Sequence, residues 1–322
     1  ELETGTSVRL DRTETNSPAL IGYTSGTTGR PKGAVLSHGN LLASVRGLEI
    51  AWRWTPDDSL ILALPLFHMH GLGVGLHGSL AVGAKAILLP KFDVDEVLDS
   101  IKKFDATMFF GVPTMYSRLL ESPKASELKQ LRLCVSGSAP LPAELHQNIR
   151  RLTGQHVLER YGMTETAMLV SNPYEGERRA GSVGFPLPGV EVRLEGDPAE
   201  IQVKGPNVFS GYWERPNENV DAFVDGWFRT GDLGAIDPDG YLSIVGRAME
   251  LIISGGFNVY PREVEDVISE YEPIRECAVV GVPDDEWGEV VVAFVVTDRE
   301  IGDEEIKDFV GERLAHYKRP RR

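Results

Sequence analysis

The stretch from Tyr23 to Gly33 has the composition of a loop that binds phosphate. It reads Tyr-Thr-Ser-Gly-Thr-Thr-Gly-Arg-Pro-Lys-Gly and follows the apolar residues Ala19–Ile21. Glycines let backbone N–H groups turn toward an anion, hydroxyl side chains add donors, and Lys32 supplies a positive charge. The spacing differs from a Walker loop, because Gly33 rather than Ser or Thr follows the lysine. The alternative is an ordinary solvated turn, since Gly, Ser and Thr are common in loops.

A second segment with chemical potential is Arg160-Tyr161-Gly162-Met163-Thr164-Glu165. It offers an aromatic ring, a hydroxyl group and a carboxylate on one turn. A carboxylate beside a phosphate loop predicts a divalent cation between them, and Mg²⁺ prefers oxygen ligands. The alternative is a capped helix start, with Thr164 followed by Glu165 in the first turn. A carboxylate can accept both hydroxyls of a ribose at once, so Asp232 in Trp227–Asp232 is a candidate ribose ligand, and Arg247 is a candidate ribose or phosphate contact.

The elements that must position these residues alternate along the chain. Short apolar strands and helical patterns follow one another as far as about residue 159, which indicates an α/β fold with a mostly parallel sheet. After Tyr174, short strands separated by Gly, Pro and Asn turns predict a small β-rich subdomain. A compact α+β unit follows, so we predict a large domain at 1–248 and a small one at 249–322. The predicted strands are 19–23 (buried), 60–64, 86–89, 107–110, 131–135, 156–159, 191–194, 200–204, 276–282 and 290–296, and the predicted helices are 37–52, 73–82, 94–104, 114–120, 143–153, 263–271 and 303–314.

Composition limits the partners. The net charge of −15 argues against nucleic acid, because phosphate backbones are bound by an excess of Lys and Arg. Cys134 and Cys277 are far apart, which predicts reduced thiols and a cytoplasmic location. No apolar run approaches the roughly 20 residues of a membrane helix, so no membrane span is expected.

The order of the motifs resembles the adenylate-forming superfamily, which includes acyl-CoA synthetases, adenylation domains of peptide synthetases and firefly luciferase. The resemblance implies a two-step ligation. An acid's carboxylate attacks the α-phosphate of Mg-ATP to give an acyl-adenylate and pyrophosphate; the small domain then turns, and the thiol of CoA displaces AMP. ATP, Mg²⁺, CoA and a small carboxylic acid are therefore the expected cofactors and partners.

The resemblance also implies roles for single residues. Tyr161 is expected to stack on adenine, Thr164 to contact phosphate and Glu165 to hold Mg²⁺, with Lys32 and His68 completing the catalytic set. The residues expected to bind ATP or AMP are Thr24, Ser25, Gly26, Thr27, Thr28, Gly29, Lys32, Gly137, Ser138, Ala139, Pro140, Tyr161, Gly162, Thr164, Asp232 and Arg247.

The small domain is expected to supply a hinge and a tunnel. By resemblance, the hinge is Met249, where relatives usually carry Lys or Asp; this departure puts the electrostatic control of the hinge in question. The turn Ser254-Gly255-Gly256 is expected to line a tunnel for the pantetheine arm of CoA. The alternative is a plain turn between a strand and a helix.

The acid pocket is expected from two further segments. His68 and Met69 are expected to line it, with His68 as a gate; a metal pair of His68 and His70 is the alternative. Arginines Arg118, Arg178 and Arg179 resemble those of malonyl-CoA synthetases, where guanidinium groups grip a second carboxylate. Either Arg178 or Arg179 fits, and the alternative is that all are surface arginines.

The predicted acid is therefore malonate or a similar small dicarboxylate. The alternatives are a fatty or aryl acid, loading of a carrier protein, and a non-catalytic nucleotide-binding module. The family's second lysine, needed for adenylation, and its leading portion are both absent from the 322 residues. The chain is therefore expected to be a fragment of a ligase that adenylates poorly alone.

Overall fold

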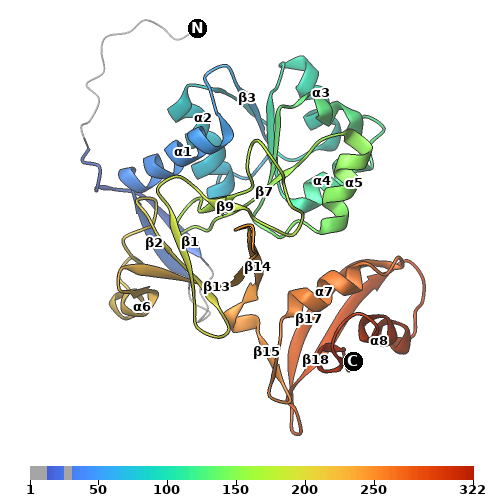
Figure 1. Ribbon diagram of the computed structural model, residues 1–322. Helices are drawn as coiled ribbons and strands as arrows, with labels where there is room; N and C mark the ends of the chain where they lie inside the picture. The colour runs from blue at the N-terminus through green and yellow to red at the C-terminus, as the bar shows by residue number, and fades with distance from the viewer. Residues whose placement is uncertain (1–12, 25–30) are drawn as a thin grey trace, which may run out of the picture.

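The computed structural model describes residues 13–24 and 31–322, and it consists of a large α/β part followed by a smaller α+β part (Figure 1). The large part is built on a seven-stranded sheet in the order β4-β3-β5-β6-β7-β8-β9. Strands β4 to β7 run parallel and the two short last strands antiparallel, which confirms the predicted mostly parallel sheet. The strands are β3 (Ser59–Leu62), β4 (Lys85–Leu88), β5 (Met108–Gly111), β6 (Leu133–Ser136), β7 (Leu158–Tyr161), β8 (Val170–Ser171) and β9 (Phe185–Pro186).

Helices cover both faces of this sheet. Side chains alternate along each strand, so Leu60 and Leu62 of β3 pack toward one face and Ile61 toward the other. Burial on both faces explains why these strands are continuous apolar runs. One face carries α1 (His38–Trp52), the π-helical turn η1 (His70–Leu76) and α2 (His77–Val82); the other carries α3 (Val94–Lys103), α4 (Pro113–Leu120), α5 (Ala143–Thr153) and the 3₁₀ turn η2 (Ala125–Gln130).

A hairpin and a second sheet flank the large sheet. Strands β1 (Pro18–Thr24) and β2 (Lys32–Ser37) pair antiparallel. The prediction of a buried strand at 19–23 is wrong in its burial, because Ile21 and Tyr23 are 38% and 69% exposed. The second sheet is antiparallel and matches the predicted β-rich subdomain. It comprises β10 (Glu191–Glu195), β11 (Glu200–Lys204), β12 (Phe223–Val224), β13 (Trp227–Ile236) and β14 (Leu242–Arg247), with α6 (Pro216–Ala222) before β12.

The small part is a four-stranded antiparallel sheet with two helices. Its core forms between the helices and the sheet, around Val264, Ile268, Val279, Val291 and Ile306. The division at residue 248 stays a prediction. The elements are η3 (Ala248–Glu250), β15 (Ile252–Ser254), β16 (Phe257–Val259), α7 (Pro261–Ser269), β17 (Ile274–Asp284), β18 (Gly288–Thr297), α8 (Asp303–Gly311) and η4 (His316–Lys318).

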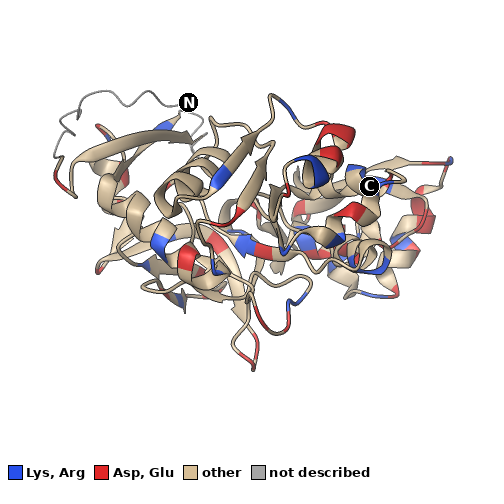
Figure 2. Ribbon diagram, turned by 90° about the horizontal axis from the view of Figure 1, so that it is seen from above, with Lys and Arg blue, Asp and Glu red and all other residues tan. Residues whose placement is uncertain are grey.

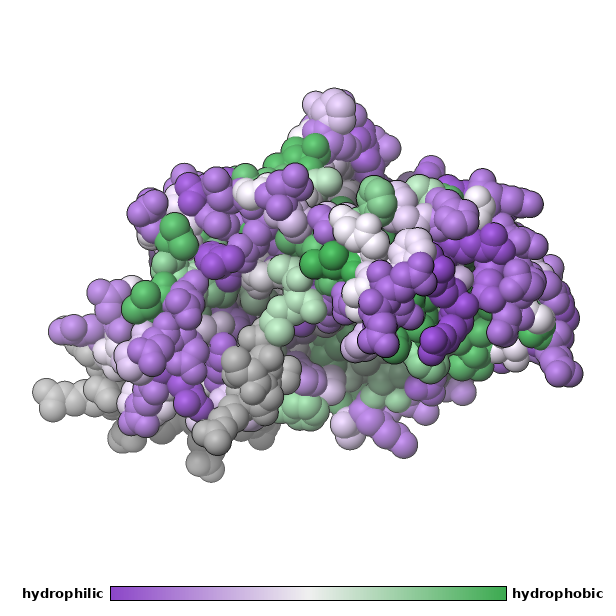
Figure 3. Space-filling model, turned by 90° about the horizontal axis from the view of Figure 1, so that it is seen from below, coloured by the Kyte–Doolittle hydropathy of each residue, from purple (hydrophilic) through white to green (hydrophobic). Residues whose placement is uncertain are grey.

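The surface carries both signs of charge. Figure 2 shows acidic and basic residues interspersed along the described helices and loops. Exposed hydrophobic residues lie in small groups among hydrophilic ones on the face seen in Figure 3. None of the helices formed by residues 13–24 and 31–322 is long and apolar enough to cross a membrane.

The amino-terminal edge of the parallel sheet carries an ion pair between the buried Asp58 and the partly exposed Arg132. The side chain of Asp58 is 3% exposed and accepts two hydrogen bonds from Arg132, at 2.6 Å from Nε and 2.5 Å from Nη2, and one from the Thr107 hydroxyl at 2.7 Å. Burial alone would raise the pKa of Asp58, but the bonds from Arg132 and Thr107 outweigh it, so the pKa lies below its ordinary value.

We expect Asp58→Asn to lower the free energy of unfolding by about 3 kcal/mol at pH 7, because it leaves Arg132 without its charge partner. A carboxyl whose pKa is lowered by folding stabilises the fold above its unfolded pKa, and this contribution is lost as the pH falls through the folded pKa. The difference between wild type and variant, measured by urea unfolding, should therefore shrink toward acid pH. A difference that stayed constant with pH would contradict the assignment.

Candidate nucleotide and acid site

Most of the predicted site residues lie at one edge of the parallel sheet. The carboxyl ends of β3, β5, β6 and β7 meet there, and the segments 64–70, 111–113, 137–141 and 162–168 follow them. Ligands of open α/β sheets bind outside this edge. The predicted residues Ser25, Gly26, Thr27, Thr28 and Gly29 lie outside the described residues. Thr24 and Lys32 pair across the base of their loop, which therefore connects the two strands of the hairpin.

The hairpin touches the turn that carries Thr164 and Glu165. Gly22 of β1 lies so close to Thr164 that a Cβ atom at position 22 would stand 2.4 Å from Thr164 Cγ2. Residues 164–166 form a hydrogen-bonded turn, so the alternative of a helix start is wrong. This close approach brings the β1–β2 hairpin and the turn together, although they are far apart in sequence.

Glu165, Tyr212 and Lys32 form a cluster beside this contact. The Glu165 side chain is buried, and the Tyr212 hydroxyl donates a hydrogen bond to its Oε1 at 2.9 Å. The Lys32 ammonium lies 5.4 Å from the centre of the Tyr212 ring. Burial raises the pKa of Glu165, so a nearby cation would favour its charged form. Tyr212 was not predicted, because nothing in its local sequence marks it.

The cluster fits a magnesium ion better than a metal held by protein alone. No group of three or more His, Cys, Asp or Glu side chains among the described residues could hold a metal. Mg²⁺ is commonly bound by one or two carboxylates together with water and substrate phosphates. The buried carboxylate of Glu165 contacts Tyr212, whose ring also lies beside the Lys32 ammonium, and it has the chemistry that such a site requires.

The predicted ribose ligands also come together. Asp232 and Arg247 are cross-strand partners on β13 and β14, with 3.3 Å between Asp232 Oδ1 and Arg247 Nε. The Tyr161 hydroxyl donates to Asp232 Oδ2 at 2.5 Å. Asp232 is 7% exposed, and burial raises its pKa even though Tyr161 and Arg247 lower it. Tyr161 therefore connects the end of β7 to Asp232, the predicted ribose ligand.

At the same edge of the sheet, the buried side chains of Arg160 and His70 lie close to the exposed Ser138. Arg160 and His70 are each 4% exposed, whereas Ser138 is exposed above them. Ser138 Oγ lies 3.3 Å from His70 Nδ1 and 3.5 Å from Arg160 Nη2. Gly137 packs directly against the Arg160 guanidinium, and Ala139 and Pro140 are exposed.

Arg160 has no direct ion pair. Within residues 13–24 and 31–322, no carboxylate lies within ion-pair distance of it and its Nε has no hydrogen-bond partner, while its Nη2 contacts Ser138 and the charge of the neighbouring Glu159 favours its charged form. The buried Nε2 of His70 also has none. Burial lowers the pKa of Arg160 to about 9; burial and the Arg160 charge lower the pKa of His70 well below its ordinary value, so the imidazole is neutral. This corner therefore has the character of an anion site.

The arginines predicted to clamp the acid have other contacts. Arg178 donates to the backbone carbonyls of Pro173 and Tyr174, at 3.1 and 2.8 Å, and to that of His156. His156 precedes β7, so Arg178 lies at the amino-terminal edge of the sheet, opposite the site. Arg118 is exposed on α4, with its guanidinium 5.1 Å from the centre of the Phe92 ring.

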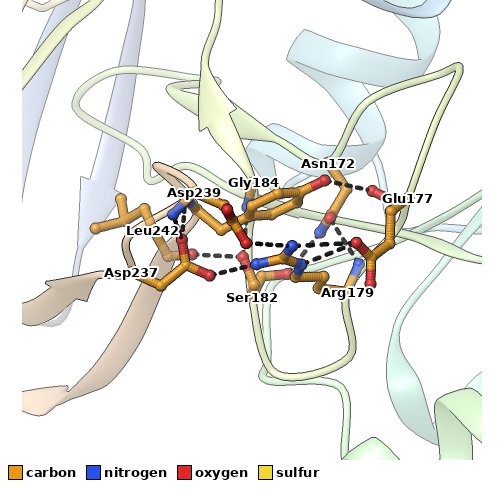
Figure 4. A network of polar contacts seen from close by, with 9 residues as sticks. Asn172, Glu177, Arg179, Ser182, Gly184, Asp237, Asp239 and Leu242 are labelled. Carbon is orange, nitrogen blue, oxygen red and sulfur yellow. Dashed lines mark hydrogen bonds and ion pairs between the residues drawn. The ribbon is translucent and has the colours of Figure 1, made fainter.

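Arg179 is held by acidic side chains near the β13–β14 turn. It pairs with Asp237 at 2.6 Å, Asp239 at 2.7 Å and Glu177 at 3.1 Å (Figure 4). Three carboxylates already surround this cation, so an added anion would be repelled. The clamp role of Arg178 and Arg179 stays a prediction, whereas Arg160 lies near the carboxyl end of β7, at the edge of the sheet where the other predicted site residues gather. Arg160 was not predicted as a site residue. Its place directly before Tyr161 could have indicated it, because side chains alternate along a strand and neighbouring residues point to opposite faces.

The remaining predicted residues lie as follows. His68 packs against the exposed Phe67, with 4.5 Å between the ring centres, while Met69 packs against Gly73. Gly255 and Gly256, with φ of 57° and 81°, form the two-residue turn between β15 and β16, a conformation that favours glycine. Ser254 is buried beside this turn. Met249 is 64% exposed in η3, which connects β14 to β15.

The contact of Gly22 with Thr164 gives a direct test. We expect Gly22→Ala to weaken ATP binding about tenfold and to lower stability by about 1–2 kcal/mol, because the new methyl group overlaps Thr164 Cγ2. Thr164→Ser removes that methyl group and keeps the hydroxyl, so the double variant should recover most of both losses. ATP titration and thermal unfolding measure the two effects. If the double variant recovered nothing, the contact would not account for the loss.

The fold is a large α/β part joined by the short segment η3 to a small α+β part, and the clusters at the sheet edge have the character of a site for a phosphate-bearing ligand. The chain belongs to the AMP-binding enzymes: the model of that family matches residues 3–213, and that of the AMP-binding enzyme C-terminal domain matches residues 263–322.

Similar proteins include several CoA ligases. A malonate–CoA ligase of Arabidopsis thaliana is 39% identical, over 95% of this chain and 57% of its own length. A long-chain-fatty-acid–CoA ligase of Bacillus subtilis is also 39% identical, over 94% of this chain and 57% of its own length. The crystal structure of ATP-bound MatB from Rhodopseudomonas palustris matches with a TM-score of 0.92 and 48% identity, covering 96% of this chain and 64% of that one. The chain thus spans about three fifths of these relatives.

Proposed function

We propose that the chain is the core of an ATP-dependent acid–CoA ligase that forms an acyl-adenylate and then an acyl-CoA, and that its acid is malonate or a similar small dicarboxylate. The observation that carries the choice of acid is the buried guanidinium of Arg160, which has no ion pair among the described residues and lies close to Ser138 and His70. A buried charge without a partner is costly, and a substrate carboxylate would supply the partner. We therefore propose Arg160 as the clamp in place of Arg178 and Arg179.

This arrangement also discriminates between acids. A dicarboxylate can place its distal carboxylate on Arg160 and present its reacting carboxylate to the α-phosphate of ATP. A monocarboxylate of similar size would leave the Arg160 guanidinium buried without a counter-charge. Sites built to pair with a polar group reject analogues that lack it far better than apolar pockets do.

The residue clusters of the site suggest which residues would contact the nucleotide and CoA. Lys32, Thr24 and Thr164 would contact the phosphates of ATP, Asp232 and Arg247 the ribose, and Tyr161 the adenine. Glu165 would hold Mg²⁺, which neutralises phosphate charge when bound. The Ser254–Gly256 turn would line the path of CoA, and Met249 would act as the hinge.

The names of the relatives support the CoA-ligase class more strongly than they support malonate as the acid. They include malonate–CoA ligases, a long-chain-fatty-acid–CoA ligase, a feruloyl-CoA synthase and an indoleacetate–CoA ligase. A cytoplasmic location and the lack of a nucleic-acid partner stay predictions; one similar malonate–CoA ligase, of Mus musculus, is named as mitochondrial.

The test is ATP–pyrophosphate exchange on the full-length polypeptide that carries this chain, with malonate, methylmalonate and octanoate in turn. We expect exchange with the two dicarboxylates and little with octanoate. Exchange with octanoate alone would overturn the dicarboxylate assignment in favour of a fatty acid ligase. Exchange with none of the acids, while ATP still binds, would favour a non-catalytic nucleotide-binding module.

A further inference from the structure

We propose that Asn207 is a positioning residue that holds the turn carrying Glu165 in the geometry required for Mg²⁺-dependent ATP binding. This inference rests on the proposed function. Asn207 lies in the loop between β11 and α6, and it is 2% exposed. It would not touch the ligand: its effect passes through the backbone of the Glu165 turn.

One short loop makes three hydrogen bonds to that turn. The Asn207 side-chain amide donates to the carbonyl of Thr166 at 2.9 Å and to that of Met168 at 2.7 Å. Two residues later, the backbone N–H of Phe209 donates to the carbonyl of Glu165 at 2.9 Å. The carbonyl groups on which the direction of Glu165 depends are therefore bound by a loop about forty positions further along the chain.

The turn needs this restraint, because one of its residues is strained. Ala167 has a φ of +53°, in the left-handed region that non-glycine residues rarely adopt. Such residues persist only where the surrounding structure holds them. The two carbonyls bound by the Asn207 amide, those of Thr166 and Met168, flank Ala167 on either side.

A second asparagine holds the loop itself. Asn40, in the first turn of α1, donates from Nδ2 to the carbonyls of Pro206 at 2.8 Å and Val208 at 2.9 Å. Its Oδ1 accepts from the backbone N–H of Ser37 at 2.9 Å. The start of α1 is thereby connected through Asn40 and Asn207 to the turn that presents Glu165. Residues that orient a metal ligand typically change metal affinity 10- to 100-fold when substituted.

The experiment measures the dissociation constant of ATP for the 322-residue chain by calorimetry, once with Mg²⁺ and once with EDTA. The readout is the Mg²⁺ enhancement, meaning the ratio of the two constants, and thermal unfolding is recorded beside it. Asn207→Asp keeps the side-chain shape but replaces the donating NH₂ group by an acceptor facing two carbonyls. We expect it to reduce the Mg²⁺ enhancement about tenfold, while ATP binding in EDTA changes less than threefold.

Asn172→Asp is the matched control. Asn172 is also 2% exposed, and its amide donates to two carbonyls, those of Glu159 at 3.1 Å and Ser182 at 2.5 Å, but not to the Glu165 turn. We expect a similar loss of thermal stability without a change in the Mg²⁺ enhancement. The inference is overturned if Asn207→Asp keeps the wild-type enhancement, or if Asn172→Asp loses as much.

A second variant covers the case in which Asn207→Asp does not fold. Asn40→Ala removes both bonds to the loop, and we expect a threefold loss of Mg²⁺ enhancement. Ser37→Ala, which leaves the Asn40 amide donors in place, should show none. Equal enhancement in these two variants would overturn the inference. If the wild-type chain binds ATP equally with and without Mg²⁺, the proposed role of Glu165 falls, and this inference falls with it.

Discussion

Arg160→Leu is expected to lower kcat/KM for malonate about 10³-fold in the full-length polypeptide. This corresponds to roughly 4 kcal/mol of lost transition-state stabilisation, within the range for one partner of a buried charge pair. Propionate, which lacks the second carboxylate, should be used as well by the variant as by the wild type, or better, because no cation is then left unpaired. Initial rates of acyl-CoA formation with the two acids measure the change in preference.

Stability separates this effect from misfolding. Arg160 is buried and has no ion pair within the described part of the chain, so replacing it with an apolar side chain should leave thermal stability unchanged or raise it. The competing assignment is tested by the double variant Arg118→Leu/Arg178→Leu. Because Arg178 binds carbonyls at the opposite edge of the sheet, this variant should lose stability but keep its preference for malonate. The reverse pattern would return the clamp to those arginines.

Glu165→Gln is expected to abolish most of the Mg²⁺ enhancement of ATP binding, by about 10²-fold. The amide has the shape of the carboxylate, and its oxygen can still accept the Tyr212 hydroxyl bond, so the turn should persist. What is lost is the negative charge that a hard cation requires. Calorimetric titration with ATP, with and without Mg²⁺, measures the effect on the 322-residue chain.

Tyr212→Phe is the companion variant. It removes the hydrogen bond at 2.9 Å but keeps both the Glu165 charge and the ring beside Lys32. We expect only a threefold loss of Mg²⁺ enhancement, since the carboxylate remains in place. A loss in Tyr212→Phe as large as that in Glu165→Gln, or no loss in Glu165→Gln, would exclude Glu165 as the metal ligand.

Local chemistry made much of the fold predictable. Strand and helix patterns depend on neighbours in sequence, so the helix at 143–153 was predicted with the observed bounds and those at 94–104 and 114–120 to within a residue. The hairpin β1–β2 was only half predicted. The first strand is as apolar in sequence as a buried strand. In the structure it pairs with β2 in a hairpin at the surface, and Ile21 and Tyr23 are exposed there.

In the site, too, features set by neighbouring residues were predictable and features set by distant contacts were not. Thr164 and Glu165 are recognisable because a hydroxyl and a carboxylate follow each other on one turn near a phosphate loop. Asp232 and Arg247 are recognisable as single residues, but their pairing depends on the register of β13 and β14. Tyr212, Asn40 and Asn207 carry no local signal, because their roles consist of hydrogen bonds to segments 39 to 168 positions away.

The sequence by itself determined the phosphate-loop composition, the order of the motifs and the alternation of strands and helices, since each depends on residue type and short spacing. Only the tertiary structure shows how each arginine is buried and paired, and the proposed choice of Arg160 as the clamp rests on that burial and pairing. Charge is read from a sequence, but burial and missing counter-charges are not. Arg179 is neutralised by carboxylates and Arg178 is hydrogen-bonded to backbone carbonyls, whereas Arg160 is buried near His70 and has no ion pair within the described residues.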